Sequence, residues 1–321
     1  MDLLVVMDPL EECDPESDTS VTLMAAALER GHRVWSCTAG QLSLVDGAVR
    51  ARARRVAPSG SAVTAAGGSR DLGLDATDAV LVRTDPPVDA GYLAMTLLLE
   101  FARGRTLVVN DPRGLREANE KLYACRFPEL MPPTVVSADA PTLLDFAERH
   151  DGAVLKPLDG HGGAGVVLLA PGDPEGPARA AAATGDGARP VMAQQFLPGV
   201  ADGDRRILLV DGETLGVLNR RPAPGEFRAN IGLGASVEVV GPSADDERIV
   251  DALAPALRAD GLWFVGIDVI DGRLSEVNVT SPTGLRQLVR LSGGRLDLTV
   301  IDRLEQRVAG PSARASGHPG S

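Results

Sequence analysis

The segment Gly266-Ile267-Asp268-Val269-Ile270-Asp271-Gly272-Arg273-Leu274-Ser275-Glu276-Val277-Asn278-Val279-Thr280-Ser281-Pro282-Thr283 places two short apolar runs on either side of an Asp-Gly turn signal. This pattern predicts a β-hairpin. Three polar side chains on the predicted strands are able to bind a cation, namely Asp268, Glu276 and Asn278. Oxygen ligands on a rigid sheet suit Mg²⁺ that is shared with nucleotide phosphates. Taken alone, the segment also fits a hairpin with surface acids.

The three candidate ligands act together only if they share one face of the hairpin. Glu276 and Asn278 are two residues apart on one strand and therefore point the same way. Asp268 joins them if it lies opposite Glu276, and we expect this pairing to require a three-residue loop at 271–273. A strict two-residue turn at 271–272 would instead oppose Asp268 to Ser275 and turn Glu276 to the other face.

Composition excludes several classes of protein. The chain has 321 residues, 44% of them hydrophobic, enough for two or three packed units. Its net charge of −12 without a basic run argues against a nucleic-acid partner. Three scattered cysteines exclude a disulfide framework or a cysteine metal cluster. No signal peptide or run of about 18 apolar residues is visible, so we expect a soluble cytoplasmic protein with no membrane partner.

The first third of the chain alternates predicted strands with predicted helices, which indicates a parallel, doubly wound sheet. The expected strands are 3–7, 33–35, 79–83 and 107–110, and the expected helices are 21–28 and 91–102. The pattern changes after residues 111–120, where we expect a crossing into a second domain. Further strands are expected at 154–158, 166–169, 191–195, 206–210 and 214–218, with helices near 177–183 and at 246–259.

A glycine-rich loop follows a single lysine. Lys156 lies near the end of the expected strand 154–158, and the loop 159–165, which includes four glycines, follows this strand at once. A second strand follows the loop. Glycines allow backbone N–H groups to approach phosphate oxygens, and the lysine adds a point charge. A plain hairpin turn explains the loop equally well, and no P-loop is present because neither Lys-Ser nor Lys-Thr follows the glycines. We interpret His161 in this loop as incidental.

Other polar groups are ambiguous when each is taken alone. Lys121 falls on a predicted helix, where a solvated lysine is the ordinary interpretation. Residues 192–198 form the end of a predicted strand. Backbone donors and acceptors there are suited to hydrogen-bond the edge of an adenine base, and the segment also fits the plain end of a core strand. The polar segment 221–236 has no periodicity, and we expect it to be a mobile loop. Four arginines bracket it, namely Arg206, Arg220, Arg221 and Arg228. Arginine side chains bind carboxylates or phosphates, but they also occur commonly on open surface.

Taken together, these motifs resemble the bacterial glutathione synthetases, members of the ATP-grasp superfamily. The resemblance runs from Met7-Asp8-Pro9 to about Arg307 and depends on many ordered strings at consistent spacing. The matching strings are Arg83 with Asp85-Pro86-Pro87, Asn119-Glu120-Lys121-Leu122, Lys156-Pro157-Leu158-Asp159-Gly160 with Gly162-Gly163-Ala164, Met192-Ala193-Gln194 with Leu197-Pro198, Asp202-Gly203-Asp204 with Arg206, Glu226 with Arg228 and Asn230, Phe264-Val265-Gly266-Ile267-Asp268, and Glu276-Val277-Asn278-Val279-Thr280-Ser281-Pro282-Thr283.

The resemblance implies an α/β plus α+β architecture, the ATP-grasp fold with an N-terminal doubly wound (Rossmann-like) domain. The expected division is an N-terminal domain at 1–118, a small lid subdomain at 119–193, a C-terminal subdomain with the metal site at 194–310, and a disordered tail at 311–321. The resemblance also implies a homo-oligomer, either a dimer or a tetramer.

The resemblance further assigns roles to individual residues. Catalytic roles fall to Arg206, Arg228 and Lys156. ATP binding falls to Lys121, Lys156, Gly160, Gly162, Gly163, Ala164, Gln194, Gln195, Phe196 and Leu197. The ligands of Mg²⁺ would be Asp268, Glu276 and Asn278, and substrate would contact Arg83, Asp204, Arg220, Asn230, Ser281 and Thr283. The implied reaction is ATP-dependent formation of an amide bond through an acyl phosphate, with ATP as co-substrate, Mg²⁺ as cofactor and small amino acids or γ-glutamyl compounds as substrates.

Four departures from the family pattern bear on the substrates. The family usually has lysine where this chain has Ser17 and Thr84, and a Gly-Gly-Arg type sequence where this chain has 234–236. After Thr283 the chain has Gly284-Leu285-Arg286-Gln287 where the family usually has Cys or a similar residue followed by Ile-Arg-Glu. The loss of three positive charges predicts a ligase that joins other amino acids. The alternatives are a glutathione synthetase that joins γ-glutamylcysteine to glycine and a non-catalytic nucleotide-binding protein.

Overall fold

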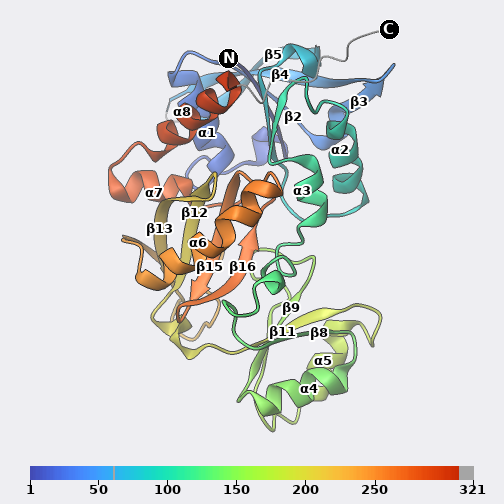
Figure 1. Ribbon diagram of the computed structural model, residues 1–321, viewed down its shortest axis with the longest axis vertical. Coiled ribbons are helices and arrows are strands. Elements are labelled where there is room, and N and C mark those ends of the chain that lie inside the picture. The colour runs from blue at the N-terminus through green and yellow to red at the C-terminus, as the bar shows by residue number, and fades with distance from the viewer. Residues whose placement is uncertain (61, 311–321) are drawn as a thin grey trace.

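The computed structural model describes residues 1–60 and 62–310 and contains three sheets stacked along its long axis (Figure 1). The first is a seven-stranded sheet with the order β3-β4-β2-β1-β6-β7, to which β5 is added through β4. Its strands are β1 (Asp2–Met7), β2 (Arg33–Cys37), β3 (Leu42–Val45), β4 (Ala48–Ser59), β5 (Ala62–Gly73), β6 (Ala79–Arg83) and β7 (Leu107–Val109). Strands β2, β1, β6 and β7 run parallel, which confirms the predicted parallel unit.

Helices cover both faces of this first sheet. They are α1 (Thr19–Glu29), α2 (Ala90–Glu100) and α3 (Pro112–Glu117), together with α7 (Leu285–Ser292) and α8 (Leu296–Ala309), which return from the far end of the chain. Helix α1 begins at Asp18, whose carboxylate accepts hydrogen bonds from the backbone N–H groups of Ser20 and Val21 and so caps the helix. In Figure 1, α8 lies beside α1. The C-terminal helices therefore complete the N-terminal layer.

The second sheet is small and antiparallel, with the order β10-β9-β11-β8. Its strands are β8 (Thr134–Ser137), β9 (Ala153–Pro157), β10 (Val167–Leu169) and β11 (Val191–Gln195). Helices α4 (Ala140–Arg149) and α5 (Gly176–Thr184) cover one face and enclose a separate apolar core with Leu143, Phe146 and Leu155. The predicted division at 193/194 falls inside β11, so the division into domains stays a prediction.

The third sheet lies between the other two and has the antiparallel order β14-β13-β12-β15-β16. Its strands are β12 (Asp204–Val210), β13 (Glu213–Arg221), β14 (Ser236–Val240), β15 (Phe264–Ile270) and β16 (Arg273–Asn278), with α6 (Ala244–Ala259) against it. Asn110 joins this sheet to the first. Its buried amide donates to the carbonyls of Phe264 and Val279 and accepts from the N–H groups of Trp263 and Phe264.

The hairpin at 264–278 has the predicted strands and the predicted pairing of Asp268 with Glu276. The predicted three-residue loop is wrong. The turn is the two-residue Asp271-Gly272, in which both residues have positive φ angles of 50° and 66°, as a type I′ turn requires. A β-bulge restores the pairing, because the register shifts between Asp268 and Val269 and leaves Ser275 as an extra residue.

Two further predictions change. Lys121 lies in a turn that precedes a short 3-10 helix, Ala124–Arg126, and is not on a regular α-helix. The segment 221–236 begins within β13, contains the short 3-10 helix Ile231–Leu233, and ends in β14, which the sequence did not predict. The predicted disordered tail at 311–321 lies outside the described residues. Within the described ranges, no helix has the length and apolar character needed to cross a membrane.

Candidate active site

A cavity of about 310 Å³ opens between the second and third sheets. It is lined by nearly all the residues that the sequence assigned to binding or catalysis, whichever sheet or loop they come from. These are Lys121, Lys156, Gly160, Gly162, Gly163, Ala164, Gln194, Gln195, Phe196, Leu197, Asp204, Arg206, Arg220, Arg228, Asn230, Asp268, Glu276, Asn278, Ser281 and Thr283. The fold thus gathers residues from positions 121 to 283 at one place.

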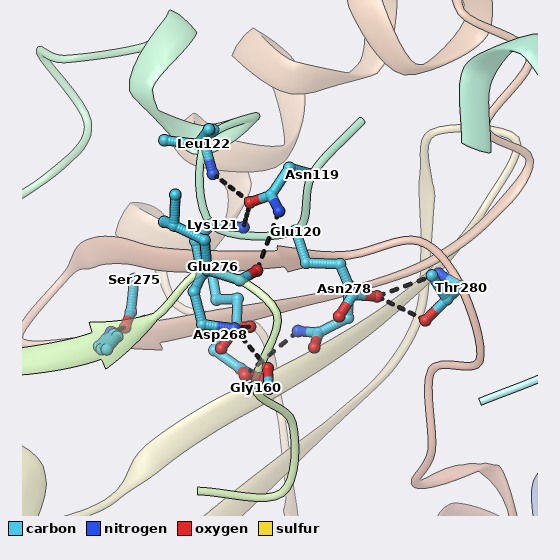
Figure 2. Close-up of polar contacts among 12 residues, drawn as sticks. Asn119, Glu120, Lys121, Leu122, Gly160, Asp268, Ser275, Glu276, Asn278 and Thr280 are labelled. Atoms are coloured by element: carbon cyan, nitrogen blue, oxygen red, sulfur yellow. Dashed lines mark hydrogen bonds and ion pairs between the residues drawn. The ribbon is translucent and has the colours of Figure 1, made fainter. Parts of the chain in front are cut away.

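The candidate metal ligands face this cavity from β15 and β16. Asp268 lies opposite Glu276, and the Asn278 amide nitrogen donates to Asp268 Oδ2 at 3.2 Å (Figure 2). The amide of Asn278 therefore keeps its oxygen available. Two carboxylates and one amide oxygen form an all-oxygen donor set, which suits Mg²⁺ and does not suit softer metals. Among the described residues, no cluster of three or more His, Cys, Asp and Glu side chains forms a richer metal site.

Asp268 belongs to a buried network of two carboxylates and two arginines. Arg206 binds it through Nε–Oδ1 at 2.6 Å and Nη2–Oδ2 at 2.9 Å, and Arg220 Nη2 approaches Oδ1 at 2.8 Å. The same Arg220 nitrogen donates to Asp204 Oδ2 at 2.7 Å. Burial opposes ionisation of Asp268, but the two arginines outweigh it and hold the pKa of this carboxyl well below its usual range.

The pKa of Asp204 is shifted in the opposite direction to that of Asp268, although the two carboxyls share the same surroundings. Burial raises the pKa of its carboxyl to about 6, and its partner Arg220 offsets this effect only in part. Asp204 Oδ1 and Arg220 Nε are both buried without a hydrogen-bond partner among the described residues. The network therefore contains one buried acceptor and one buried donor that have no hydrogen-bond partner among the described residues.

Both lysines are held by polar partners close to the candidate metal ligands. Lys121 Nζ donates to the carbonyl of Gly160 at 2.6 Å and to Glu276 Oε1 at 3.1 Å (Figure 2). Lys156 Nζ donates to Gln194 Oε1 at 2.7 Å and to Ser275 Oγ at 2.8 Å. Burial lowers the pKa of Lys156, and Glu276 opposes this shift. Two amines held close to the candidate metal ligands form a compact site for an anion.

The glycine-rich loop and the 222–235 loop contact each other across the cavity. Arg228 Nη1 donates to the carbonyl of Gly163 at 3.2 Å. Gly163 has a φ of +80°, and a Cβ atom there would lie 2.6 Å from Asn230 Oδ1, so a larger residue would be strained and would require the Asn230 side chain to move. Glu226 holds Arg228 in place through Nη2–Oε2 at 2.6 Å. The two loops thus meet where side chains of the 222–235 loop approach the backbone of Gly163.

The other end of the cavity is apolar. Its lining includes Val154, Val166, Phe196, Leu197, Phe227 and Ile270. Phe196 follows β11, and its N–H donates to the carbonyl of Gly152 at 3.1 Å, while the N–H of Gln195 donates to Pro133 at 2.9 Å. These two backbone donors are satisfied inside the protein, so they are not free to read an adenine edge. An apolar end beside an anion-binding end matches the two halves of a nucleotide.

Arg83 is the exception among the predicted site residues, because it does not line the cavity. Its side chain is only 4% exposed, and it donates to Ser20 Oγ at 3.1 Å and to the carbonyl of Pro282 at 3.0 Å. The arginine therefore supports the segment that carries Ser281 and Thr283 from behind.

The positions that lack the basic residues of the family also lie away from the cavity. Ser17 donates to Asp14 at 2.6 Å, Thr84 contacts Met95 Sδ at 3.5 Å, and Ser236 begins β14 on the exposed surface. None of the three is among the described residues that line the cavity. The side chains present at these positions therefore contribute nothing to the lining, although Thr84 directly precedes Asp85, which does line the cavity.

Sequence reasoning missed several residues of the site. Glu120 is buried and its Oε1 accepts from the N–H groups of Val279 and Thr280 and from Thr280 Oγ1, which fixes the end of β16 (Figure 2). Its place in the string Asn119-Glu120-Lys121 was a usable signal. Ser275 enters the site only through the bulge, and Phe227 lies in a polar loop without periodicity, so neither had a local signal.

Comparison with known proteins gives one consistent result. Residues 1–116 match the sequence model of the family described as "Prokaryotic glutathione synthetase, N-terminal domain", and residues 120–293 match that of "Prokaryotic glutathione synthetase, ATP-grasp domain". The chain is 43% identical to a glutathione synthetase from Synechocystis sp. over 96% of its own length and 100% of the relative's. It is 46% identical to a glutathione synthetase from Parasynechococcus marenigrum, covering 95% and 99% of the two chains.

Solved structures agree on the fold. D-cycloserine synthetase DcsG superposes with a TM-score of 0.63 at 15% identity, over 96% of this chain and 100% of that one. The ATP-grasp ligase PsnB complexed with minimal precursor superposes with a TM-score of 0.62 at 20% identity, over 95% and 99%. Both likenesses confirm the predicted ATP-grasp fold.

Proposed function

The chain belongs to the prokaryotic glutathione synthetase family of the ATP-grasp superfamily, and we propose that it joins γ-glutamylcysteine to glycine. As a member of this family it is an ATP-dependent ligase that forms an amide bond and releases ADP, with ATP as co-substrate and Mg²⁺ as cofactor. Its substrates are small molecules. The ligase assignment replaces the reading of a non-catalytic nucleotide-binding protein.

The choice of substrates differs from the first expectation of other amino acids. Two observations support glutathione synthesis. Relatives named glutathione synthetase are 43% and 46% identical over nearly their full lengths. In addition, Ser17, Thr84 and Ser236, which suggested altered substrates, lie away from the cavity lining. The side chains at these three positions therefore do not shape the cavity directly.

The donor set on β15 and β16 fits Mg²⁺, as the reaction requires. Asp268, Glu276 and Asn278 would hold the ion through oxygen atoms, and Lys121 and Lys156 would hold the phosphates beside it. A bound Mg²⁺ neutralises charge on the β- and γ-phosphates. Phosphoryl transfer needs positioning and charge neutralisation and does not need a protein nucleophile, and these residues are of that kind.

The remaining residues would bind and shield the amino-acid substrates. In the proposed reaction, the cysteinyl carboxylate of γ-glutamylcysteine attacks the γ-phosphate, and ADP leaves. The amine of glycine then attacks the carbonyl carbon of the acyl phosphate, loses a proton and displaces inorganic phosphate, which leaves the new amide bond. Arg206 and Arg228 would stabilise the transferred phosphate, and Arg220, Asp204, Asn230, Ser281 and Thr283 would position the substrates. Arg83 would act indirectly by holding Pro282. The two loops would exclude water from the acyl phosphate.

Two further expectations stay proposals. We retain the division into an N-terminal domain, a small lid subdomain and a C-terminal subdomain, which the three separate sheets support. A dimer or tetramer is also retained, and light scattering of the purified protein would measure it.

One observation carries the proposed function: a single cavity contains the oxygen donors of β15 and β16, both lysines and three arginines. The experiment that tests it is a competition between γ-glutamylcysteine and simple amino acids as the carboxylate donor, with glycine as acceptor. Relative kcat/KM is measured from ADP release. We expect a preference of about ten- to a hundredfold, because an unpaired carboxylate site loses about 1.5–3 kcal/mol. A preference for simple amino acids as the carboxylate donor would instead favour a ligase that joins amino acids other than γ-glutamylcysteine and glycine.

A further inference from the structure

Phe227 forms an aromatic pair with Phe196 at the apolar end of the cavity. The two ring centroids are 6.4 Å apart and the rings are inclined at 76°, an edge-to-face arrangement. Both rings line the cavity. The chain has only six phenylalanines, and two of them meet at this point. The pair joins two different parts of the protein, because Phe196 belongs to the end of β11 and Phe227 to the 222–235 loop.

The direction of Phe227 is fixed by its own segment. The carboxylate of Glu226 accepts hydrogen bonds from the N–H of Phe227 at 2.9 Å and from the N–H of Arg228 at 3.0 Å. The same carboxylate binds the guanidinium of Arg228, and that guanidinium lies 5.9 Å from the centre of the Phe227 ring. One carboxylate therefore orders residues 226–228 and presents the ring and the arginine together.

The two side chains that follow Glu226 reach different parts of the site. Arg228 extends to the glycine-rich loop through the carbonyl of Gly163, at the side where the lysines lie. Phe227 extends to Phe196 among the apolar side chains. A nucleotide bound with its phosphates at the lysines would therefore place its base beside these two rings. An aromatic ring binds any planar base through its face or edge and excludes water from it.

We propose that Phe227 is a binding residue for the adenine base, so that the 222–235 loop closes on the base as well as on the phosphates. Phe196 forms the fixed wall and Phe227 the movable one. The proposal rests on the proposed placement of ATP in this cavity. It predicts that the loop distinguishes a nucleotide from a bare triphosphate, because only the nucleotide offers a ring to Phe227.

Calorimetric titration of the full-length protein tests the proposal, with ADP and inorganic tripolyphosphate as separate ligands, each with excess Mg²⁺. Phe227→Ala should weaken ADP binding about tenfold, or about 1.4 kcal/mol, and leave tripolyphosphate binding unchanged. Phe227→Trp, which keeps an aromatic ring, should restore ADP binding to within about threefold of the wild type. Leu233→Ala is the matched control, since this apolar side chain of the same loop is absent from the cavity lining.

The outcomes separate the two claims. If the wild type fails to bind ADP, the placement of ATP is wrong. If the wild type binds ADP and Phe227→Ala binds it equally well, the role of Phe227 is overturned while the placement of ATP stands. An equal loss of ADP and tripolyphosphate binding would also overturn it, because that result indicates a general disturbance of the loop. Loss of ADP binding in Leu233→Ala would lead to the same conclusion.

Discussion

Arg206 on β12 lies opposite Asp268 on β15, and its guanidinium binds the carboxylate through two hydrogen bonds of 2.6 and 2.9 Å. Both residues are only 6% exposed. Arg220 adds a second cation at 2.8 Å. A candidate metal ligand is thus kept ionised inside the protein by two arginines. The same two arginines line the cavity.

Removing this carboxylate should destabilise the protein. Asp268→Asn leaves the buried guanidinium of Arg206 without its carboxylate partner and leaves Arg220 with Asp204 alone, and breaking a buried ion pair typically costs about 3–5 kcal/mol. The control is Asp302→Asn, which breaks the exposed pair with Arg30 and should cost less than about 1 kcal/mol. Denaturant unfolding of both variants measures the difference. Equal free energies of unfolding for the two variants would show that the network does not stabilise the fold.

Glu276 should matter for turnover more than for nucleotide binding. Glu276→Gln removes one negative oxygen from the candidate metal site and weakens the partner of Lys121. We expect kcat to fall at least about a hundredfold, while the dissociation constant for ADP changes by less than about tenfold. Glu213→Gln, at an exposed carboxylate paired with Arg303, is the control and should retain wild-type turnover. A Glu276→Gln variant with normal kcat would remove this residue from the metal site.

The two loops should become ordered together. Amides in 160–165 and 222–235 are expected to exchange rapidly in the free protein, since short loops rich in glycine bury few groups. A non-hydrolysable ATP analogue with γ-glutamylcysteine should slow exchange in both loops. Hydrogen exchange followed by mass spectrometry measures this change, with β15 as an internal reference. Exchange at the same rate in both states would contradict closure.

The raised pKa of Asp204, about 6, makes a specific prediction about stability. An ordinary carboxyl with a pKa of 3.8 loses its proton at lower pH, so the folded state binds an extra proton between pH 4 and 6. The contribution of Asp204 to the free energy of unfolding is therefore fully present below pH about 4. It decreases as the pH rises through about 6, by up to about 3 kcal/mol.

Asp204→Asn cannot titrate and provides the comparison. The free energy of unfolding of the wild type, minus that of Asp204→Asn, should decrease from pH 4 to 6.5 and stay level above pH 7. Both proteins are measured in buffer with EDTA to remove divalent metals. A difference that increases with pH over this window would mean that the carboxyl is favoured in its charged form.

Strong local patterns predicted many of the strands, and the family resemblance named most of the residues that line the cavity. Apolar runs such as 3–7 and 79–83 became β1 and β6 because buried parallel strands need continuous apolar sequence. The pairing of Asp268 with Glu276 was predicted correctly, although the predicted loop of three residues was wrong. The bulge at Ser275 depends on how the two strands twist and pack, and no residue type in the sequence predicts it.

Other parts of the fold depend on contacts that one sequence does not reveal. Strands β4 and β5 are rich in arginine, alanine and glycine, so the extension of the first sheet had no apolar alternation to indicate it. The hypothesis of altered substrates depended on Ser17, Thr84 and Ser236, and sequence position alone could not show that they lie outside the cavity. Phe227 was missed for the same reason, because its partner Phe196 is far away in the sequence.

The most direct measurement of the central claim uses γ-glutamylcysteine labelled with ¹⁸O in its cysteinyl carboxylate. The protein is incubated with this compound, glycine, ATP and Mg²⁺, and the products are analysed by mass spectrometry. The account predicts glutathione and ADP in equal amounts, with one ¹⁸O atom transferred to each inorganic phosphate, because the carboxylate attacks the γ-phosphate. ADP release without glutathione, or phosphate that carries no ¹⁸O, would contradict the account.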